Sequence, residues 1–277
     1  MDAITSSGLA KTTMTSAGYP PLRRSAVTWF VVAALGQLAF VWMILAHYGV
    51  KGLAGNFSGW NDKPLIKGFV SGDTTGNIIF AVHVLLAALV TTGGLLQLVP
   101  AIRTRTPMLH RWVGRMFFSV AVVMATSGLW LTWARHTYLS LVSGLAVSLD
   151  GALILSFTAI AWRHAVKRDF AAHRRWALRA FMVVNGVWFL RIGMMAWVLL
   201  SGGGVGMNDS LSGPADVVIQ FGAYLVPLIV LEAYLRASAS RTLHAKRMTA
   251  ALIFLATPIT VLGVCGAVAF MWWPYMR

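Results

Sequence analysis

Seven stretches of the chain are long and apolar enough to cross a membrane as helices. They cover residues 26–48, 77–101, 113–134, 138–162, 178–200, 216–235 and 248–273. Each is close to the ~20 residues that a bilayer requires of a spanning helix. Charged residues gather between these stretches and do not alternate within them. The pattern predicts an all-α, polytopic transmembrane bundle of seven helices, in which residues 26–277 form one domain.

The first 25 residues have a different character from the rest. They are rich in Ser, Thr and Ala and show no apolar periodicity, so we expect a flexible tail. The apolar stretch that follows is longer than the core of a signal peptide and lacks a small-residue cleavage site. We therefore expect it to be retained as the first transmembrane helix.

Basic residues are concentrated in alternate gaps between the apolar stretches. One set of gaps holds seventeen of them: Lys11, Arg23, Arg24, Arg103, Arg105, Arg111, Arg115, Arg163, Lys167, Arg168, Arg174, Arg175, Arg179, Arg236, Arg241, Lys246 and Arg247. The other set holds only Lys51, Lys63, Lys67, Arg135 and Arg277. By the positive-inside rule, the N-terminus is predicted in the cytoplasm and the C-terminus outside, in the inner membrane of a bacterium.

Composition agrees with a membrane protein and narrows the chemistry. Hydrophobic residues make up 58% of the chain and charged residues only 11%. Because the basic residues account for orientation, nucleic acid is not an expected partner, whereas the lipid bilayer is. The single cysteine, Cys265, excludes a disulfide framework or a thiolate zinc site. No hydrolase or phosphate-binding motif is present, and the sequence leaves open whether the protein is an enzyme.

Two short motifs are near copies of each other. L-H-R-W-V-G-R covers residues 109–115, and H-R-R-W-A-L-R covers residues 173–179. We call them the two histidine boxes. Each stands at the cytoplasmic start of an outward-going helix, which predicts an internal repeat of two helical hairpins. The second to fifth helices would then form a four-helix core with both boxes at equal depth.

Together with His83, the histidine boxes resemble the uncharacterised bacterial membrane proteins of domain of unknown function 2306, most clearly over the second to fifth helices. More distantly, their spacing is similar to that of the cytochrome b561 superfamily, whose four core helices each present a histidine and bind two b haems. In that resemblance, His83, His110 and His173 match the first, second and fourth positions, and Asp150 stands at the third.

The resemblance implies a haem b near the cytoplasmic face, with His110 and His173 as the metal ligands. Two imidazoles from facing helices suit low-spin haem iron, and arginines suit propionates. The candidate propionate partners are four of the five arginines of the two boxes, namely Arg111, Arg115, Arg174 and Arg179. His83 is a further candidate cofactor contact, or else a hydrogen-bonded core residue. Transmembrane electron transfer of the cytochrome b561 kind would involve a quinone or a redox partner.

The same boxes satisfy the rules for interfacial anchors without any cofactor. The alternative is therefore a non-enzymatic integral membrane protein, namely a sensor, a small transporter or an assembly subunit.

Two charged residues lie near the middle of apolar stretches. Asp150 is at the centre of the fourth and Arg191 is within two residues of the centre of the fifth. Because an isolated charge in hydrocarbon is costly, we expect them to form a buried ion pair, either as a structural clasp or as a proton or substrate site. Glu232, near the inner end of the sixth stretch, is expected to pair with an arginine.

Overall fold

The computed structural model describes residues 19–63 and 66–276, and in these ranges the chain is helical with connecting turns. The long helices are α1 (Pro20–Ile44), α3 (Thr74–Leu98), α5 (Pro107–Trp133), α6 (Leu141–Val166), α9 (Pro214–Ala239) and α10 (Leu243–Gly266). A seventh crossing is divided into α7 (Phe170–Val184) and α8 (Gly186–Ser201). Short elements are α2 (Val50–Leu53), α4 (Pro100–Arg105), the 3₁₀ turns η2 (Ser58–Asp62) and η4 (Trp273–Tyr275), and the π-helical segments η1 (Leu45–Gly49) and η3 (Ala267–Trp272).

The prediction of a helical membrane bundle is confirmed. Six helices of the described chain have the length and apolarity to cross a membrane, and the bent pair α7–α8 makes a seventh crossing if it counts as one. The outer surface is apolar, with Leu35, Trp42, Val218 and Phe254 all more than 60% exposed. In water such a surface would aggregate, but in a bilayer it faces lipid.

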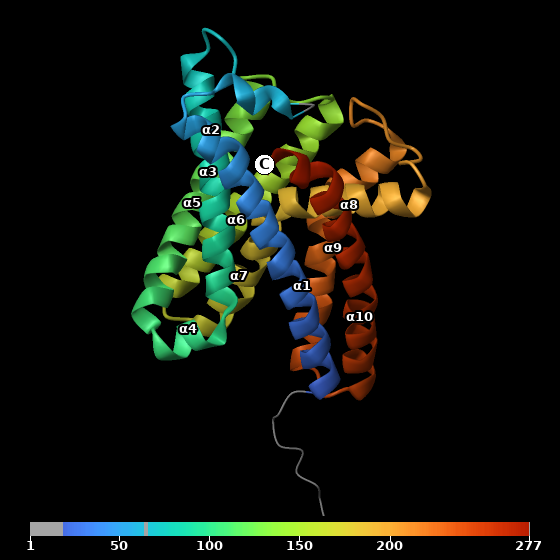
Figure 1. Cartoon of the computed structure of the whole chain (residues 1–277). Coiled ribbons are helices and arrows are strands. Elements are labelled where there is room, and N and C mark those ends of the chain that lie inside the picture. The colour runs from blue at the N-terminus through green and yellow to red at the C-terminus, as the bar shows by residue number, and fades with distance from the viewer. Residues whose placement is uncertain (1–18, 64–65, 277) are drawn as a thin grey trace, which may run out of the picture.

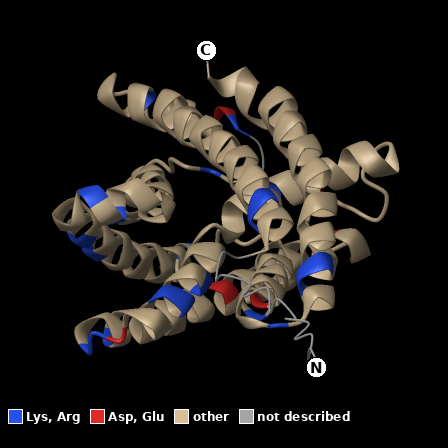
Figure 2. Ribbon diagram, turned by 90° about the horizontal axis from the view of Figure 1, so that it is seen from below, with Lys and Arg blue, Asp and Glu red and all other residues tan. Residues whose placement is uncertain are grey.

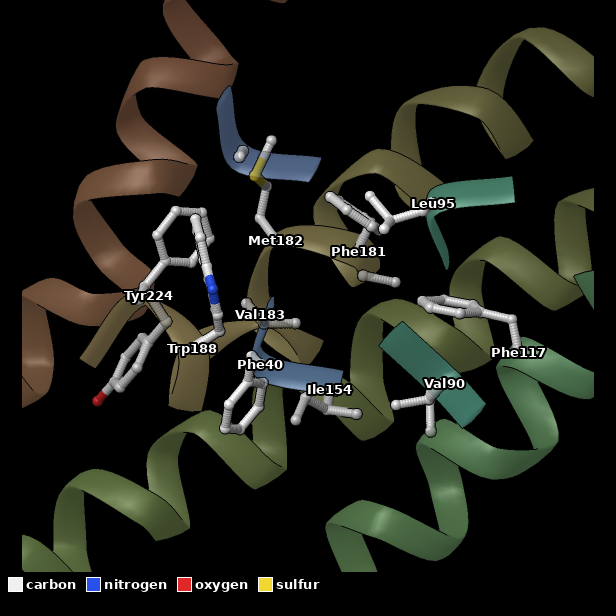
Figure 3. Close-up of a cluster of buried hydrophobic side chains, with 14 of the residues drawn as sticks. Phe40, Val90, Leu95, Phe117, Ile154, Phe181, Met182, Val183, Trp188 and Tyr224 are labelled. Atoms are coloured by element: carbon white, nitrogen blue, oxygen red, sulfur yellow. The ribbon is translucent and has the colours of Figure 1, made fainter. Parts of the chain in front are cut away.

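The long helices form two neighbouring groups (Figure 1). Helices α3, α5, α6 and α7 pack in sequence, as the predicted four-helix core requires, while α10 packs on α1, α8 and α9. A single cluster of buried side chains joins the groups. Figure 3 shows Phe40 of α1, Ile154 of α6, Val183 of α7, Trp188 of α8 and Tyr224 of α9 converging on it.

We call the end of the bundle that holds the start of α1, α4, the α6–α7 turn and the α9–α10 turn the basic end. The other end, which carries residues 54–73, is the loop end. Figure 2 views the bundle from below Figure 1 and shows Lys and Arg on several helices, with few acidic residues.

Helix α1 begins before its predicted start at residue 26. Pro20 and Pro21 occupy its first turn, where a missing backbone N–H costs nothing. Leu22 is buried against Ala237, Ala250 and Ile253, so α9 and α10 hold this turn in place. Residues 20–25 are therefore helix, and the rest of the predicted tail, residues 1–18, lies outside the described residues.

The fifth predicted helix, residues 178–200, is not one straight helix. The chain breaks at Asn185, and α7 and α8 meet at an angle of 53°. The Asn185 side-chain amide donates to the Phe181 carbonyl at 2.8 Å, and Gly186 follows directly. A polar side chain that bonds its own backbone and a glycine are common causes of a sharp bend within a helix.

Candidate functional site

His110 and His173 lie in the first turns of α5 and α7, both at the basic end. Helix α5 begins at Pro107. Helix α7 begins after Asp169, whose carboxylate accepts from the Ala172 N–H at 3.1 Å. That hydrogen bond, together with nearby His164 and Arg175, holds the pKa of Asp169 below its usual range. The two boxes therefore occupy equivalent places, as the predicted repeat requires.

His173 packs on Phe118 of α5 with 6.0 Å between ring centroids, so the helices that carry the two histidines touch near the basic end. His173 Nδ1 lies 2.9 Å from the Ala161 carbonyl of α6. Because a carbonyl only accepts, Nδ1 carries the hydrogen and Nε2 keeps its lone pair. His110 Nδ1 is buried and has no hydrogen-bond partner in the part of the chain that the structure describes. Two nearby imidazoles, one with its tautomer set by a backbone carbonyl, form a possible metal-ligand pair.

The four arginines named as candidate propionate partners fall into two groups. Arg111, Arg115 and Arg174 are exposed at the basic end, and Arg115 stacks over the Trp112 ring at 5.1 Å. Arg179 instead forms an ion pair with Glu232 of α9, with 2.6 Å between Nε and Oε1. The expected pairing of Glu232 with an arginine is confirmed. Because Arg179 is held by that carboxylate and by the Trp176 ring at 4.5 Å, a propionate could reach it only by displacing Glu232.

His83 lies between α3 and α5, away from the two boxes. Its Nδ1 is 2.8 Å from the Ser127 hydroxyl, which itself donates to the Val123 carbonyl. The imidazole packs so closely on Gly128 that a Cβ there would lie 3.2 Å from its Cε1. The surroundings match the hydrogen-bonded core residue that the sequence allowed, and no described contact joins His83 to a second histidine.

The predicted ion pair between Asp150 and Arg191 is wrong. Neither residue takes part in any of the four ion pairs within 4.0 Å in residues 19–63 and 66–276. Asp150 lies against the helix break, where a Cβ on Gly186 would come 2.6 Å from its Oδ2. Arg191, five residues beyond the break, stacks over Phe40 of α1 at 5.1 Å. Asp150 therefore contacts the helix break and Arg191 contacts α1, a difference that depth along a straight helix does not reveal.

A polar cluster at the loop end was not predicted. Arg135, whose side chain is 6% exposed, donates to Asp73 at 2.8 Å, to Asn77 at 2.7 Å and to the Gly68 carbonyl at 3.2 Å. Asp73 also caps α3 by accepting from the Gly76 N–H at 2.8 Å. The only sequence signal was an acidic residue directly before an apolar helix, which is a common cap. The cluster joins α3, the end of α5 and the loop.

No group of three or more His, Cys, Asp or Glu side chains suited to a metal ion occurs in the described ranges. A site built entirely from protein ligands is therefore absent there. Axial ligation of haem iron requires only two side chains, because the porphyrin supplies the other four ligands.

Comparison with known proteins identifies the family. Residues 80–235 match the model described as "Predicted membrane protein (DUF2306)", which is more than half of the chain. No curated protein and no solved structure matches this chain. The comparisons do not support the resemblance to cytochrome b561. The matched range contains both histidine boxes and α3 to α9 almost entirely. The chain therefore belongs to the DUF2306 family of multi-pass membrane proteins.

Proposed function

We propose that this protein binds one haem b at the basic end of the bundle, with His110 and His173 as axial ligands. The observation that carries the proposal is that the two histidines stand in the first turns of α5 and α7, two helices that touch through Phe118 and His173, with the Nε2 lone pair of His173 left free by the Ala161 hydrogen bond. Ligating histidines commonly donate their other ring N–H to a backbone carbonyl in this way.

The surroundings of the pair suit an anionic, aromatic cofactor. The Phe118 ring meets His173 edge-on, with 6.0 Å between centroids. Arg111, Arg115 and Arg174 are exposed at this end and are the arginines free to pair with propionates, whereas Arg179 is held by Glu232. Bound haem supplies one-electron chemistry. The chain's own residues would hold the iron, pair the propionates and exclude water from the buried side. We infer a role in electron transfer with a quinone or a protein redox partner.

The test is haem content. The full chain is expressed with ample haem supply, purified in neutral detergent and assayed by visible absorption and pyridine haemochrome. We expect a Soret band in the wild type and its loss in His110→Ala and His173→Ala. His244→Ala is the matched control, since His244 is exposed at the same end and should leave haem content unchanged. Haem absent from a folded wild type, or fully retained in both variants, would refute the proposal.

A second candidate function is transport of a small solute or proton, and it rests on the break between α7 and α8. Discontinuous helices often form binding sites near the centre of the membrane. Asp150 Oδ1 and the Tyr224 hydroxyl are buried without hydrogen-bond partners in the described chain. Proton flux into proteoliposomes that Asp150→Asn abolishes would support transport, whereas equal flux in wild type and variant would argue against it.

A further inference from the structure

Arg191 is the one charged residue of α8, and its neighbours are aromatic and cationic. Its guanidinium carbon lies 5.1 Å from the centroid of Phe40, and its Nη1 donates to the Val187 carbonyl of its own helix at 3.0 Å. The side chain is half-buried. No carboxylate of residues 19–63 or 66–276 lies within 4.0 Å of it. The guanidinium therefore retains donors that the described chain does not satisfy.

Lys63, from the loop, is the second cation at this position. Its Nζ lies 5.0 Å from the Tyr275 ring centroid and 3.7 Å from Met43 Sδ, a weak acceptor. It too has no ion pair in the described ranges. Phe40 and Met43 of α1 are three residues apart and so lie on one face of that helix, and His47 of η1 follows four residues later. Arg191 stacks over Phe40 and Lys63 lies beside Met43. The two positive charges therefore flank the same face of α1.

Aromatic groups and a further donor complete the surroundings. Trp272 packs on Phe40 with 5.3 Å between centroids, and its buried indole N–H has no acceptor in the described chain. Tyr48 and Tyr275 both pack edge-on against the His47 ring. Tyr48 belongs to η1 and Trp272 to η3, and such π-helical segments are frequent at functional sites. These surroundings are rich in hydrogen-bond donors, and the nearby carboxylate of Asp62 is already paired with Lys51.

Two unpaired like charges in partly buried positions repel each other and lose hydration, so the arrangement is unfavourable without a counter-ion. An oxyanion would relieve both costs. The guanidinium offers a planar fork of N–H donors that matches a carboxylate or phosphate, and the ammonium adds a compact charge. Aromatic walls would suit an apolar body attached to that anion.

We propose that Arg191 and Lys63 together bind the carboxylate or phosphate group of a ligand, which is either a soluble anion or an anionic lipid headgroup. This oxyanion site is at the loop end, whereas the proposed haem is at the basic end. Its existence does not depend on haem binding.

The test is binding of defined probes to the full chain, purified in neutral detergent and stripped of lipid. Benzoate and inorganic phosphate represent soluble oxyanions. Dihexanoyl phosphatidylglycerol represents the lipid, with the phosphatidylcholine analogue as its zwitterionic control. Calorimetry gives the affinity, and the rise of the unfolding temperature with probe concentration gives an independent measure.

We expect saturable binding to the wild type and affinity lower by roughly tenfold or more in Lys63→Gln and Arg191→Gln, since each removes a charge-assisted hydrogen bond. Lys67→Gln removes an exposed lysine of the same loop and should bind as the wild type does. If Arg191→Gln does not fold, Lys63→Gln alone decides, since it changes only a loop side chain.

Binding of phosphate or benzoate would assign a soluble ligand, and binding of phosphatidylglycerol alone would assign a lipid headgroup. Absence of saturable binding by every probe, or equal binding by wild type and Lys63→Gln, would overturn the proposal. Neither result bears on haem content, so the two proposals fail separately.

Discussion

Arg135 illustrates how a single side chain joins segments that are distant in sequence. It contacts Asp73 and Asn77, 62 and 58 residues away, and the carbonyl of Gly68. Its charge is nearly buried, so these acceptors replace the water that it loses. One arginine thus holds the loop to α3 and α5.

Replacing Arg135 with Gln should destabilise the protein by about 2 kcal/mol, because Asp73 keeps its charge and loses its partner. The measurement is thermal unfolding in detergent, combined with protease cleavage of residues 54–73, which should become faster. Lys67→Gln is the control with an equal change in charge. Unchanged stability and cleavage in Arg135→Gln would show that the ion pair contributes nothing measurable.

Lys63 should make binding at the proposed oxyanion site depend on pH. Burial and the neighbouring Arg191 lower the pKa of Lys63 to about 8. The charged and titratable groups around it are Arg191 from α8, His47 from η1, Tyr275 from η4 and the adjacent Asp62, which is paired with Lys51. As pH rises through 8, the ammonium loses its proton while Arg191 stays charged, so anion affinity should fall.

Benzoate is the suitable probe for this effect, since it stays ionised throughout. We expect calorimetry to give weaker binding at pH 9 than at pH 7 for the wild type, and little change for Lys63→Arg, whose guanidinium stays protonated. An equal decline in both proteins would mean that another group titrates.

At the scale of elements, the contact of α8 with α10 depends on small residues. A Cβ on Gly263 would collide with the Ile192 carbonyl, and one on Gly266 would lie 2.9 Å from a Leu199 methyl. Without side chains at these positions, the two backbones approach closely, as is common between membrane helices. This contact supports the bent helix that carries Arg191.

Gly263→Ala should therefore destabilise the fold by about 1–3 kcal/mol, because a backbone carbonyl cannot move aside as a side chain can. Gly222→Ala on α9 is the matched control, since its nearest neighbour would be a Val226 methyl at 3.7 Å. Thermal unfolding of both variants in detergent provides the comparison. A Gly263→Ala protein as stable as Gly222→Ala would show that the helices separate easily.

At the scale of the whole molecule, the start of α1 and the last described residues of η4 lie at opposite ends of the bundle (Figure 1). This arrangement fits an odd number of crossings, in which α7 and α8 together count as one crossing. An odd number of crossings agrees with the seven apolar stretches of the sequence.

The positive-inside rule predicts that the basic end faces the cytoplasm. Reporter fusions test this prediction. A cytoplasmic reporter should be active after Lys167 and inactive after Arg277, and a periplasmic reporter should give the reverse. The opposite pattern would mean that the bundle is inverted in the membrane.

Sequence alone determined the class of this protein, the approximate positions of its membrane crossings and the equivalence of its two histidine boxes. These features are local, since hydrophobic length and motif similarity depend only on neighbouring residues. The sequence also predicted that Glu232 pairs with an arginine, since arginines are plentiful near it.

The tertiary structure decided the partners of the intramembrane charges. Arg191 of α8, beyond the bend at Asn185, stacks over Phe40 of α1, whereas Asp150 lies against Gly186 at the bend. Such pairings depend on the relative rotation and tilt of packed helices, which depth along a straight helix does not specify.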